Sequence, residues 1–233
     1  MKRSYTINII LLLLSLALMA GCTNSDGRIT DEGTVTYKLV CPMSWEYNKK
    51  NDNLLSLFPQ NISLHFKNNN SVLYIKGLFF MIKYLTRYDE GRNYTAISIG
   101  MNDNMMCVQD TSQTAFGYND MEDLKITNTE DTLTVAGYLC KKAIAECPAR
   151  NMRFDVWYTQ NIKIKNANSN NAFKNIDGVP MKFDILLMNF YMHLEAVDVK
   201  YDKVGDEWFE IPDFKSGSKQ ELMEFMNHYM RNN

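Results

Sequence analysis

The feature that most constrains the fold is a set of short segments whose apolar side chains fall on both faces of an extended chain. Segments 78–85 (LFFMIKYL) and 184–190 (DILLMNF) carry apolar residues at consecutive positions. Successive side chains of a strand point to opposite faces, so a sheet with one wet face shows alternation instead. These segments therefore need cover on both sides. A strongly curved sheet whose hollow holds a helix or an apolar ligand would supply that cover.

Strand-like segments follow one another along most of the chain and are separated by clusters of turn residues. Residues 51–60 indicate a helical turn that Pro59 ends, and hairpin connections are expected at 147–151 and at Asn189-Phe190. We predict a mainly β fold with a single strongly curved antiparallel sheet, in the form of a half-open barrel. The expected strands are 34–41, 61–66, 71–76, 81–88, 93–99, 104–110, 133–146, 152–159, 180–188 and 191–201.

The last part of the chain has the signature of a helix. Ser218 and Glu221 have the spacing of a capping box, in which each side chain accepts a hydrogen bond from the backbone N–H of the other residue. Apolar residues then recur at helical spacing, at Leu222, Phe225, Met226 and Tyr229. This pattern predicts a C-terminal helix over residues 218–230 that covers part of the sheet.

The N-terminus is typical of a secretory signal. Lys2 and Arg3 precede an apolar stretch over residues 9–20, which falls short of the ~20 residues that a membrane-spanning helix needs. The residues Met19-Ala20-Gly21 before Cys22 resemble a bacterial lipobox, although Met19 replaces the usual Leu. We expect a signal peptide over residues 1–21 and a lipid attached at Cys22. The alternative is ordinary cleavage that leaves a plain thiol.

The residues after Cys22 indicate how the mature chain is organised. Residues 22–33 are almost free of apolar side chains and predict a flexible tether, followed by a single β-rich domain over 34–233. Thr23 is not the Asp that retains lipoproteins in the inner membrane of enteric bacteria, so we expect an outer-membrane lipoprotein that faces the periplasm or the cell surface. The expected partners are the membrane, through the anchor, and an apolar ligand or an envelope protein.

Charge and cysteine content narrow the function further. Loss of Lys2 and Arg3 with the leader reduces 25 basic residues to 23 against 27 acidic ones, a net charge of −4 without a basic stripe, so we expect no binding to nucleic acid. An exported chain can oxidise its remaining cysteines, Cys41, Cys107, Cys140 and Cys147. Their pairing stays open, except that Cys140 and Cys147 would lie ~23 Å apart on one extended strand.

The segments GYLCKKA (137–143), DVWYT (155–159), IDGVPMKF (176–183) and FEIPDFK (209–215) together form a pattern with a known counterpart. The pattern resembles an uncharacterised family of Bacteroides-type lipoprotein domains related to the GLPGLI group, over residues 33–215. The chain has Asp177-Gly178-Val179-Pro180 where those relatives carry their namesake residues, so it is placed beside that group. The resemblance implies a fold similar to LolA and LolB, whose curved sheet holds acyl chains. It implies no reaction and no catalytic residue.

Motifs for catalysis and metal binding are weak. Residues 216–219 match S-x-x-K, but too few residues follow for the other elements of that acylating site, so the motif is a helix cap. His65, His193 and His228 lie far apart in the chain. The run Met101 to Cys107 contains soft ligands, yet Met105 and Met106 would point to opposite faces of a strand. We expect no enzyme activity, no cofactor and no metal site.

The sequence therefore predicts a lipid-anchored envelope protein that binds a hydrophobic ligand, either a lipid or an acyl chain, in the concave face of its sheet. The alternative is an interaction module, without enzyme activity, that docks on another envelope protein. The C-terminal helix would form a lid through Leu222, Phe225 and Met226. The candidate lining of the ligand site comes from one face of two strands: Phe154, Val156, Tyr158, Met181, Phe183, Ile185 and Leu187.

Overall fold

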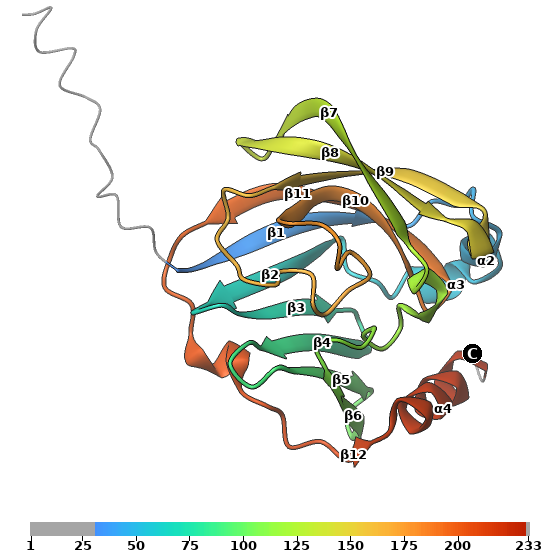
Figure 1. The fold of residues 1–233 in the computed structure, drawn as a ribbon. Coiled ribbons are helices and arrows are strands. Elements are labelled where there is room, and N and C mark those ends of the chain that lie inside the picture. The colour runs from blue at the N-terminus through green and yellow to red at the C-terminus, as the bar shows by residue number, and fades with distance from the viewer. Residues whose placement is uncertain (1–30, 232–233) are drawn as a thin grey trace, which may run out of the picture. The chain divides into compact units, whose positions relative to one another are not determined.

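The computed structural model describes residues 31–231 (Figure 1). The strands of this region are β1 (Glu32–Val40), β2 (Asn61–Lys67), β3 (Asn70–Lys76), β4 (Phe80–Arg87), β5 (Arg92–Ile99), β6 (Asp103–Asp110), β7 (Lys125–Val135), β8 (Tyr138–Cys147), β9 (Met152–Thr159), β10 (Val179–Leu187), β11 (Phe190–Lys200) and β12 (Ser216–Gly217). The helices are α2 (Glu46–Lys50), α3 (Asp52–Leu55) and α4 (Lys219–Arg231), with short 3-10 turns η1 (Asn119–Met121), η2 (Pro148–Arg150) and η3 (Asp206–Phe209).

The described strands form one 12-stranded sheet in the order β12-β6-β5-β4-β3-β2-β1-β11-β10-β9-β8-β7. All neighbours pair antiparallel except β12, which runs parallel to β6. The sheet bends strongly without joining its edge strands β12 and β7 (Figure 1). The prediction of a mainly β fold with one curved, half-open sheet and a C-terminal helix is therefore confirmed. The short parallel strand was not predicted.

The signal peptide and Cys22 lie outside the described residues. The tether predicted over 22–33 lies outside them except for its last residues, and there the prediction is wrong, because Glu32 and Gly33 already belong to β1. Gly33 pairs with Phe66 of β2. A Cβ at Gly33 would lie 2.4 Å from the carbonyl oxygen of Lys200, so a larger residue would displace the neighbouring strand.

Two-residue turns connect several neighbouring strands. Asn68-Asn69, Ala136-Gly137 and Met188-Asn189 all have positive φ at both positions, the conformation of the tight hairpin turns that match strand twist. Two predictions are corrected here. Residues 133–146 are not one strand, because Ala136-Gly137 reverses the chain between β7 and β8, and residues 125–132 belong to β7. The turn before β11 is Met188-Asn189 and not Asn189-Phe190, because Phe190 is the first residue of that strand.

The helical turn predicted over 51–60 begins earlier than expected. It is two short helices, α2 and α3, which together span 46–55. The buried side chain of Asn48 in α2 exchanges hydrogen bonds with the backbone of Tyr191, at 2.7 Å to its carbonyl oxygen and 3.2 Å from its N–H. Strand β1 ends before it reaches Tyr191 of β11. The Asn48 side chain takes its place there and satisfies the backbone N–H and carbonyl groups of Tyr191.

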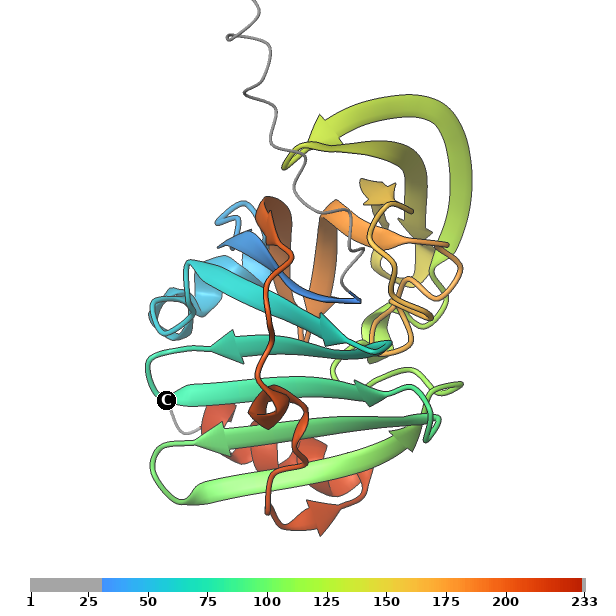
Figure 2. The same ribbon diagram turned by 90° about the vertical axis from the view of Figure 1, so that its left-hand side faces the viewer.

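A strap formed by residues 202–215 crosses the outer face of β2 to β5 (Figure 2). Val204 and Phe209 pack there on Val72 and Leu85. The Lys83 ammonium, which burial desolvates, donates to the carbonyl oxygen of Glu210 at 2.7 Å. Apolar residues on the outer face of β3 and β4 are therefore covered, as the sequence pattern required.

We expect His65, which lies on the outer face beneath the strap, to make the stability of the fold depend on pH. His65 stacks on Trp208 at 3.9 Å between ring centroids and is only 9% exposed. Burial lowers the pKa of His65 from 6.5 to about 4, opposed by the nearby Asp202 carboxylate. The unfolded chain binds this proton below pH ~6.5 and the folded chain only below pH ~4, so stability is lost as the pH falls through that window.

We expect this group to lower the free energy of unfolding by about 1–3 kcal/mol between pH 7 and pH 4, after allowance for solvent screening. Urea unfolding at a series of pH values measures the loss. Carboxylates titrate in the same range, so the informative quantity is the difference between the wild type and His65→Gln. Identical pH profiles for the two proteins would rule out this role of His65.

Cys41, Cys107, Cys140 and Cys147 are all free thiols in the structure. Cys140 and Cys147 lie on the same strand, β8, as the sequence argument against their pairing assumed. Burial raises the pKa of Cys107 and of Cys140 to about 11. These thiols are therefore protonated at neutral pH and behave as small apolar core residues.

Candidate functional site

The hollow of the sheet is largely occupied by the chain itself. Two connections, residues 111–124 and 160–178, run along the inner face (Figure 1). The phenol of Tyr84 donates to the carbonyl oxygen of Phe116 at 2.9 Å, and Asn93 donates to the carbonyl oxygen of Ser169 at 2.6 Å. The connections also place apolar side chains in the main core, namely Ala115, Phe116, Tyr118, Met121, Leu124, Ile162, Ala167, Phe173 and Ile176.

Phe173 lies at the centre of the side chains that occupy the hollow of the sheet. Its side chain is fully buried and makes edge-to-face contacts with Phe183 of β10 at 5.3 Å and Phe154 of β9 at 6.4 Å between centroids. Both contacts fall in the favourable range for aromatic pairs. Phe173 therefore occupies the space beside the two strands where the sequence had placed an apolar ligand.

The predicted lining residues lie on the inner face but do not form a cavity there. Phe154, Val156, Tyr158, Met181, Ile185 and Leu187 are buried in the main core, and Phe183 packs against it. The predicted lid residues Leu222 and Met226 are also in the core, with Phe225 packed against it. Of all ten residues, only Met226 borders the apolar pocket described next.

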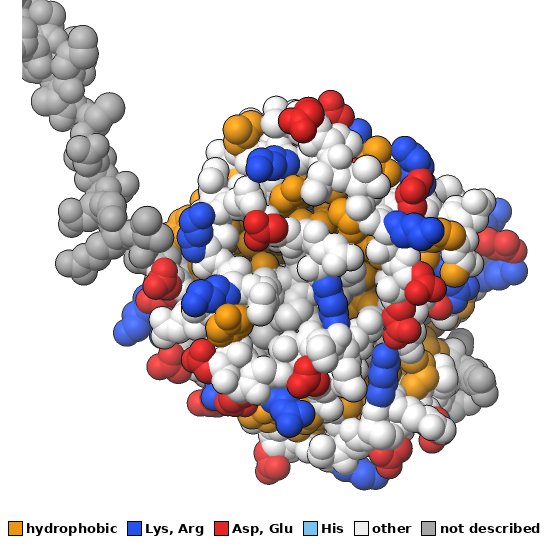
Figure 3. Space-filling model, viewed as in Figure 1, with side chains coloured by type: hydrophobic (Ala, Val, Ile, Leu, Met, Phe, Trp, Pro, Cys, Tyr) orange, Lys and Arg blue, Asp and Glu red, His pale blue; other side chains and the backbone are white. Residues whose placement is uncertain are grey.

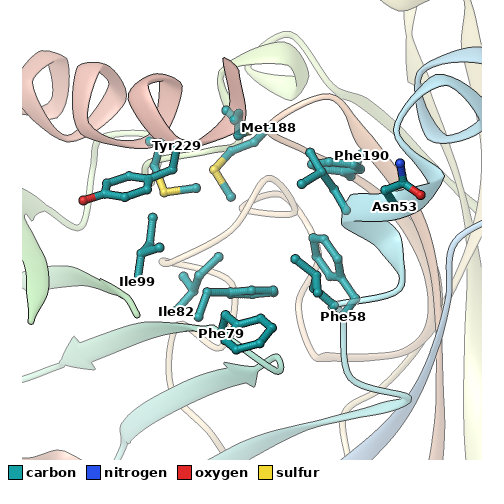
Figure 4. Close-up of a pocket in the computed structure, with 13 residues that line it drawn as sticks. Asn53, Phe58, Phe79, Ile82, Ile99, Met188, Phe190 and Tyr229 are labelled. Atoms are coloured by element: carbon teal, nitrogen blue, oxygen red, sulfur yellow. The ribbon is translucent and has the colours of Figure 1, made fainter. Parts of the chain in front are cut away.

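An apolar pocket of about 490 Å³ remains where α3 and α4 approach the ends of β4 and β5 (Figure 4). Its size is within the range of small-molecule sites. The pocket contains no charged side chain. The lining residues are Asn53, Leu54, Leu57, Phe58, Phe79, Phe80, Ile82, Ile99, Met188, Phe190, Met226, Tyr229 and Met230.

One wall of the pocket is an aromatic cluster fixed by backbone contacts. Phe58 lies 5.0 Å from Phe80 and 5.2 Å from Phe190 between ring centroids. The Leu78 N–H donates to the carbonyl oxygen of Leu57 at 2.8 Å, which joins the end of the α3 segment to the β3–β4 connection. A Cβ at Gly77 would lie 2.4 Å from the same oxygen, so only glycine permits this approach.

The opposite wall is α4, which is fixed at both ends. The capping box forms as predicted: Glu221 N–H donates to Ser218 Oγ at 3.1 Å, and Ser218 N–H donates to Glu221 Oε2 at 2.7 Å. Leu222 is fully buried. At the other end, a hydrogen bond to the Asp103 carboxylate raises the pKa of Tyr229. Strand β12, which directly precedes the helix, pairs with β6, and Asp103 is the first residue of β6. Helix α4 is therefore attached to β6 near both of its ends.

Large apolar side chains stand exposed at the neighbouring hairpin tips. Leu78 is 70% exposed, Phe79 61% and Met101 91%. The N–H of Gly100 donates to the carbonyl oxygen of Phe79 at 2.8 Å, which holds the two tips together. Only Phe79 of these three residues also lines the pocket.

Sequence reasoning missed most of the pocket residues. Leu54, Leu57 and Phe58 lie in or just after the short helices, and Phe79 lies in a turn. The one available signal was the run Leu78-Phe79-Phe80, because a turn rarely carries three large apolar residues in succession. The pocket is formed by five segments that lie far apart in the chain. That they meet is a property of the tertiary structure, which the local sequence pattern does not contain.

Few side chains in the described region are grouped in a way that suits metal binding or acid–base catalysis. Between residues 31 and 231, no group of three or more His, Cys, Asp or Glu side chains is arranged to hold a metal ion. His65, His193 and His228 remain apart, on β2, β11 and α4. Met105 and Cys107 are buried, whereas Met101 is almost fully exposed, so the soft side chains of that run do not converge.

Charges of both signs are interspersed over the face shown in Figure 3. No helix in residues 31–231 combines the length and the apolar character needed to cross a membrane. The fold and the pocket together define a class: a mainly β domain with one open, curved sheet and an uncharged apolar pocket at one end.

Comparison with known proteins adds fold information only. No protein-family model matches the chain, and no curated protein matches it. Two solved structures of PNGF-II, in space groups C2 and P21, are similar with TM-scores of 0.54 at 13% and 14% sequence identity. They cover 84% of this chain, which spans about a third (32% and 33%) of those chains. At this identity the likeness concerns the fold.

Proposed function

We propose that this protein binds an apolar ligand of the acyl-chain type in the pocket between α3, α4 and the ends of β4 and β5. The observation that carries the proposal is an open space of about 490 Å³ lined by apolar and aromatic side chains and without a charged group. Burying apolar surface in such a site is favourable by ~25 cal/mol per Å². A buried charge would lack a partner there, which favours a hydrocarbon chain over an ionic ligand.

The composition of the pocket suits ligands of variable shape. Met188, Met226 and Met230 contribute three flexible thioether side chains, and methionine adapts to irregular apolar surfaces. The polar groups of the lining are the Asn53 amide and the Tyr229 phenol, which Figure 4 shows at opposite sides of the pocket. A ligand with one polar end would place that end at the mouth and its hydrocarbon chain between these walls.

We also propose that a lipid on Cys22 anchors the protein to the outer membrane, where the domain faces the periplasm or the cell surface. We expect no enzyme activity. Two or more acyl chains on one residue anchor a protein stably, whereas one chain does so only marginally. We expect mass spectrometry of the N-terminal peptide from membrane-extracted protein to find Cys22 as the first residue, with acyl groups attached. A mature protein that carries an unmodified Cys22 would contradict the anchor and leave the pocket proposal standing.

Substitutions at two adjacent exposed residues test the pocket. Phe79→Glu places a carboxylate in the lining, whereas Leu78→Glu places it beside the pocket, and both side chains are more than half exposed. With the fluorescent probe N-phenyl-1-naphthylamine, we expect micromolar binding to the wild type. Phe79→Glu should bind about tenfold more weakly, because a carboxylate would lose water there, and Leu78→Glu should differ by less than about twofold.

Both variants should unfold at the wild-type urea concentration, since exposed substitutions change stability by no more than about 0.5 kcal/mol. An absence of probe binding to the wild type would refute the pocket. A tenfold loss in both variants would instead show that the probe binds the exposed hairpin tips.

A second candidate function is docking on an envelope protein without a carried ligand. The observation in its favour is the exposed apolar group formed by Leu78, Phe79 and Met101, because contiguous exposed apolar surface often marks an interaction site. Under this alternative, Leu78→Glu and Met101→Glu would abolish co-purification of an envelope partner while probe binding stays unchanged. Co-purification unaffected by both substitutions would exclude it.

A further inference from the structure

The outer face of the sheet carries a second groove, of about 760 Å³, within the size range of small-molecule sites. The groove crosses β1, β11, β10 and β9, which are consecutive in the sheet. Exposed polar residues alternate there with buried core residues, as His193 and Glu195 do with Met192 and Leu194. Alternate side chains of a strand point to opposite faces, so the polar ones face solvent.

Strand register places the polar side chains of the groove in one row. Glu195 of β11 lies opposite Lys38 of β1 on one side and opposite Lys182 of β10 on the other. Lys182 in turn lies opposite Trp157 of β9. Directly opposite side chains have Cβ atoms about 4.5–5.5 Å apart. The row therefore presents an ammonium, a carboxylate, a second ammonium and an indole side by side across four strands.

The polar groups of the groove are held in place by their neighbours. The Lys182 ammonium lies 3.0 Å from the Glu195 carboxylate. The Asp184 carboxylate accepts a hydrogen bond from the Tyr191 phenol at 2.5 Å and is also bonded to the His193 ring. Side chains that are already ordered lose little further conformational freedom when a ligand binds. The groove is thus a preorganised set of hydrogen-bond donors and acceptors.

Aromatic side chains supply the apolar surface of the groove, namely Trp157, Phe154 and Phe183. The Lys142 ammonium lies 5.4 Å from the centroid of the Trp157 ring and forms an ion pair with Asp155 at 3.0 Å. Lys142 belongs to β8, so it holds the indole from the side away from β10. The side of the indole toward β10 borders the groove, where C–H groups of a ligand can pack on it.

The chemistry of the lining selects among ligand classes. Charged ligands gain little, because three basic side chains balance three acidic ones. A hydrocarbon chain would strip water from ionic groups without replacing their hydrogen bonds. A neutral sugar fits both parts of the lining, since its ring faces carry C–H groups and its hydroxyls both donate and accept hydrogen bonds. The charged lining residues are Lys38, Arg153, Lys182, Asp155, Asp184 and Glu195.

We propose that this groove binds a neutral oligosaccharide. One sugar ring packs on Trp157, and hydroxyl groups bond to Lys182 and Glu195 in the same row. Hydrogen bonds in which one partner is charged are stronger than those between neutral groups. The row crosses four strands and spans about 14 Å, so it extends beyond a single ring. The groove shares no lining residue with the α3–α4 pocket, and the two sites can be tested independently.

The test is an NMR titration of the full ¹⁵N-labelled chain with four neutral tetrasaccharides: cellotetraose, maltotetraose, mannotetraose and tetra-N-acetylchitotetraose. We expect at least one of them to bind with a dissociation constant below about 5 mM. It should shift the indole N–H signal of Trp157 more than those of Trp45 and Trp208. Tetragalacturonic acid, an anionic probe of the same length, should bind no more tightly than the best neutral sugar.

Two acidic residues of β11 provide a matched control. Each forms an ion pair with a lysine, and the side chains are 52% exposed for Glu195 and 49% for Asp198. Only Glu195 lines the groove. Glu195→Gln should bind the best sugar about tenfold more weakly, and Asp198→Asn should differ by less than about twofold. Both variants should fold normally, because exposed ion pairs contribute little to stability.

Trp157→Leu retains an apolar side chain but removes the aromatic ring, and it should also bind about tenfold more weakly. An absence of shifts with all four tetrasaccharides at about 10 mM would overturn the proposal. Equal affinity of the wild type, Glu195→Gln and Trp157→Leu would place the sugar elsewhere and overturn it too. Tighter binding of tetragalacturonic acid than of every neutral sugar would show that the groove selects charge.

Discussion

Replacing Phe173 by alanine should lower the free energy of unfolding by about 3–5 kcal/mol, the range measured for removal of a buried aromatic ring. Phe173 is fully buried and packs against Phe154 of β9 and Phe183 of β10. Its removal leaves a cavity between Phe154 and Phe183 and loses both edge-to-face contacts. Urea unfolding followed by circular dichroism measures the change.

Phe173→Leu retains most of the apolar volume and should cost only about 1–2 kcal/mol. If Phe173→Ala instead lost less than about 1 kcal/mol, the connection 160–178 would not contribute to the core as described. The hollow would then be available to a ligand, as the sequence had suggested.

Introducing a charge at Leu222 should detach α4 from the sheet. Leu222 is fully buried in the main core, and a carboxylate at that position would lack a partner and cost several kcal/mol. We expect the amides of α4 in Leu222→Asp to lose protection from hydrogen exchange while those of β1 and β11 retain it. Probe binding should fall at least about thirtyfold, because α4 supplies Met226, Tyr229 and Met230 to the pocket.

His228→Asp is the matched control for this experiment, since His228 is exposed on the same helix and does not line the pocket. It should retain both helix protection and binding. If Leu222→Asp destabilised the whole sheet, Leu222→Ala would measure the same coupling at a cost of about 2–5 kcal/mol. Full probe binding by a variant with an unprotected α4 would show that the helix is not a wall of the site.

The sequence predicted the sheet well because strand signals are local. Alternation, β-branched residues and the Asn cluster at 68–70 placed β2 and β3 within a residue of their observed bounds. The capping box at Ser218 placed α4 equally well. Where a turn used residues without turn preference, such as Ala136 and Met188 at positive φ, the pattern gave no warning. In those places cross-strand pairing imposes a conformation that side-chain propensity does not favour.

The site was harder to predict because filling a hollow is a property of the whole fold. Strand parity grouped Phe154 with Val156 and Tyr158, and Phe183 with Met181 and Ile185, but did not decide which face of the sheet is concave. In the structure Phe154 is part of the main core and Phe183 packs against it. What occupies that space is set by Phe173, a single aromatic residue in the polar stretch 166–175. Nothing local distinguishes it from a loop residue facing water. The open pocket instead arose between α3 and α4, where only Met226 had been expected.

The most direct test of the account is a crystal structure of the protein with palmitic acid. We predict electron density for the hydrocarbon chain between Ile82, Met188 and Phe190, with α4 in place and Phe173 still seated between β9 and β10. Density beside β9 and β10, with residues 160–178 displaced, would contradict the proposed location. A pocket closed by its own side chains and without bound ligand would contradict the proposed function.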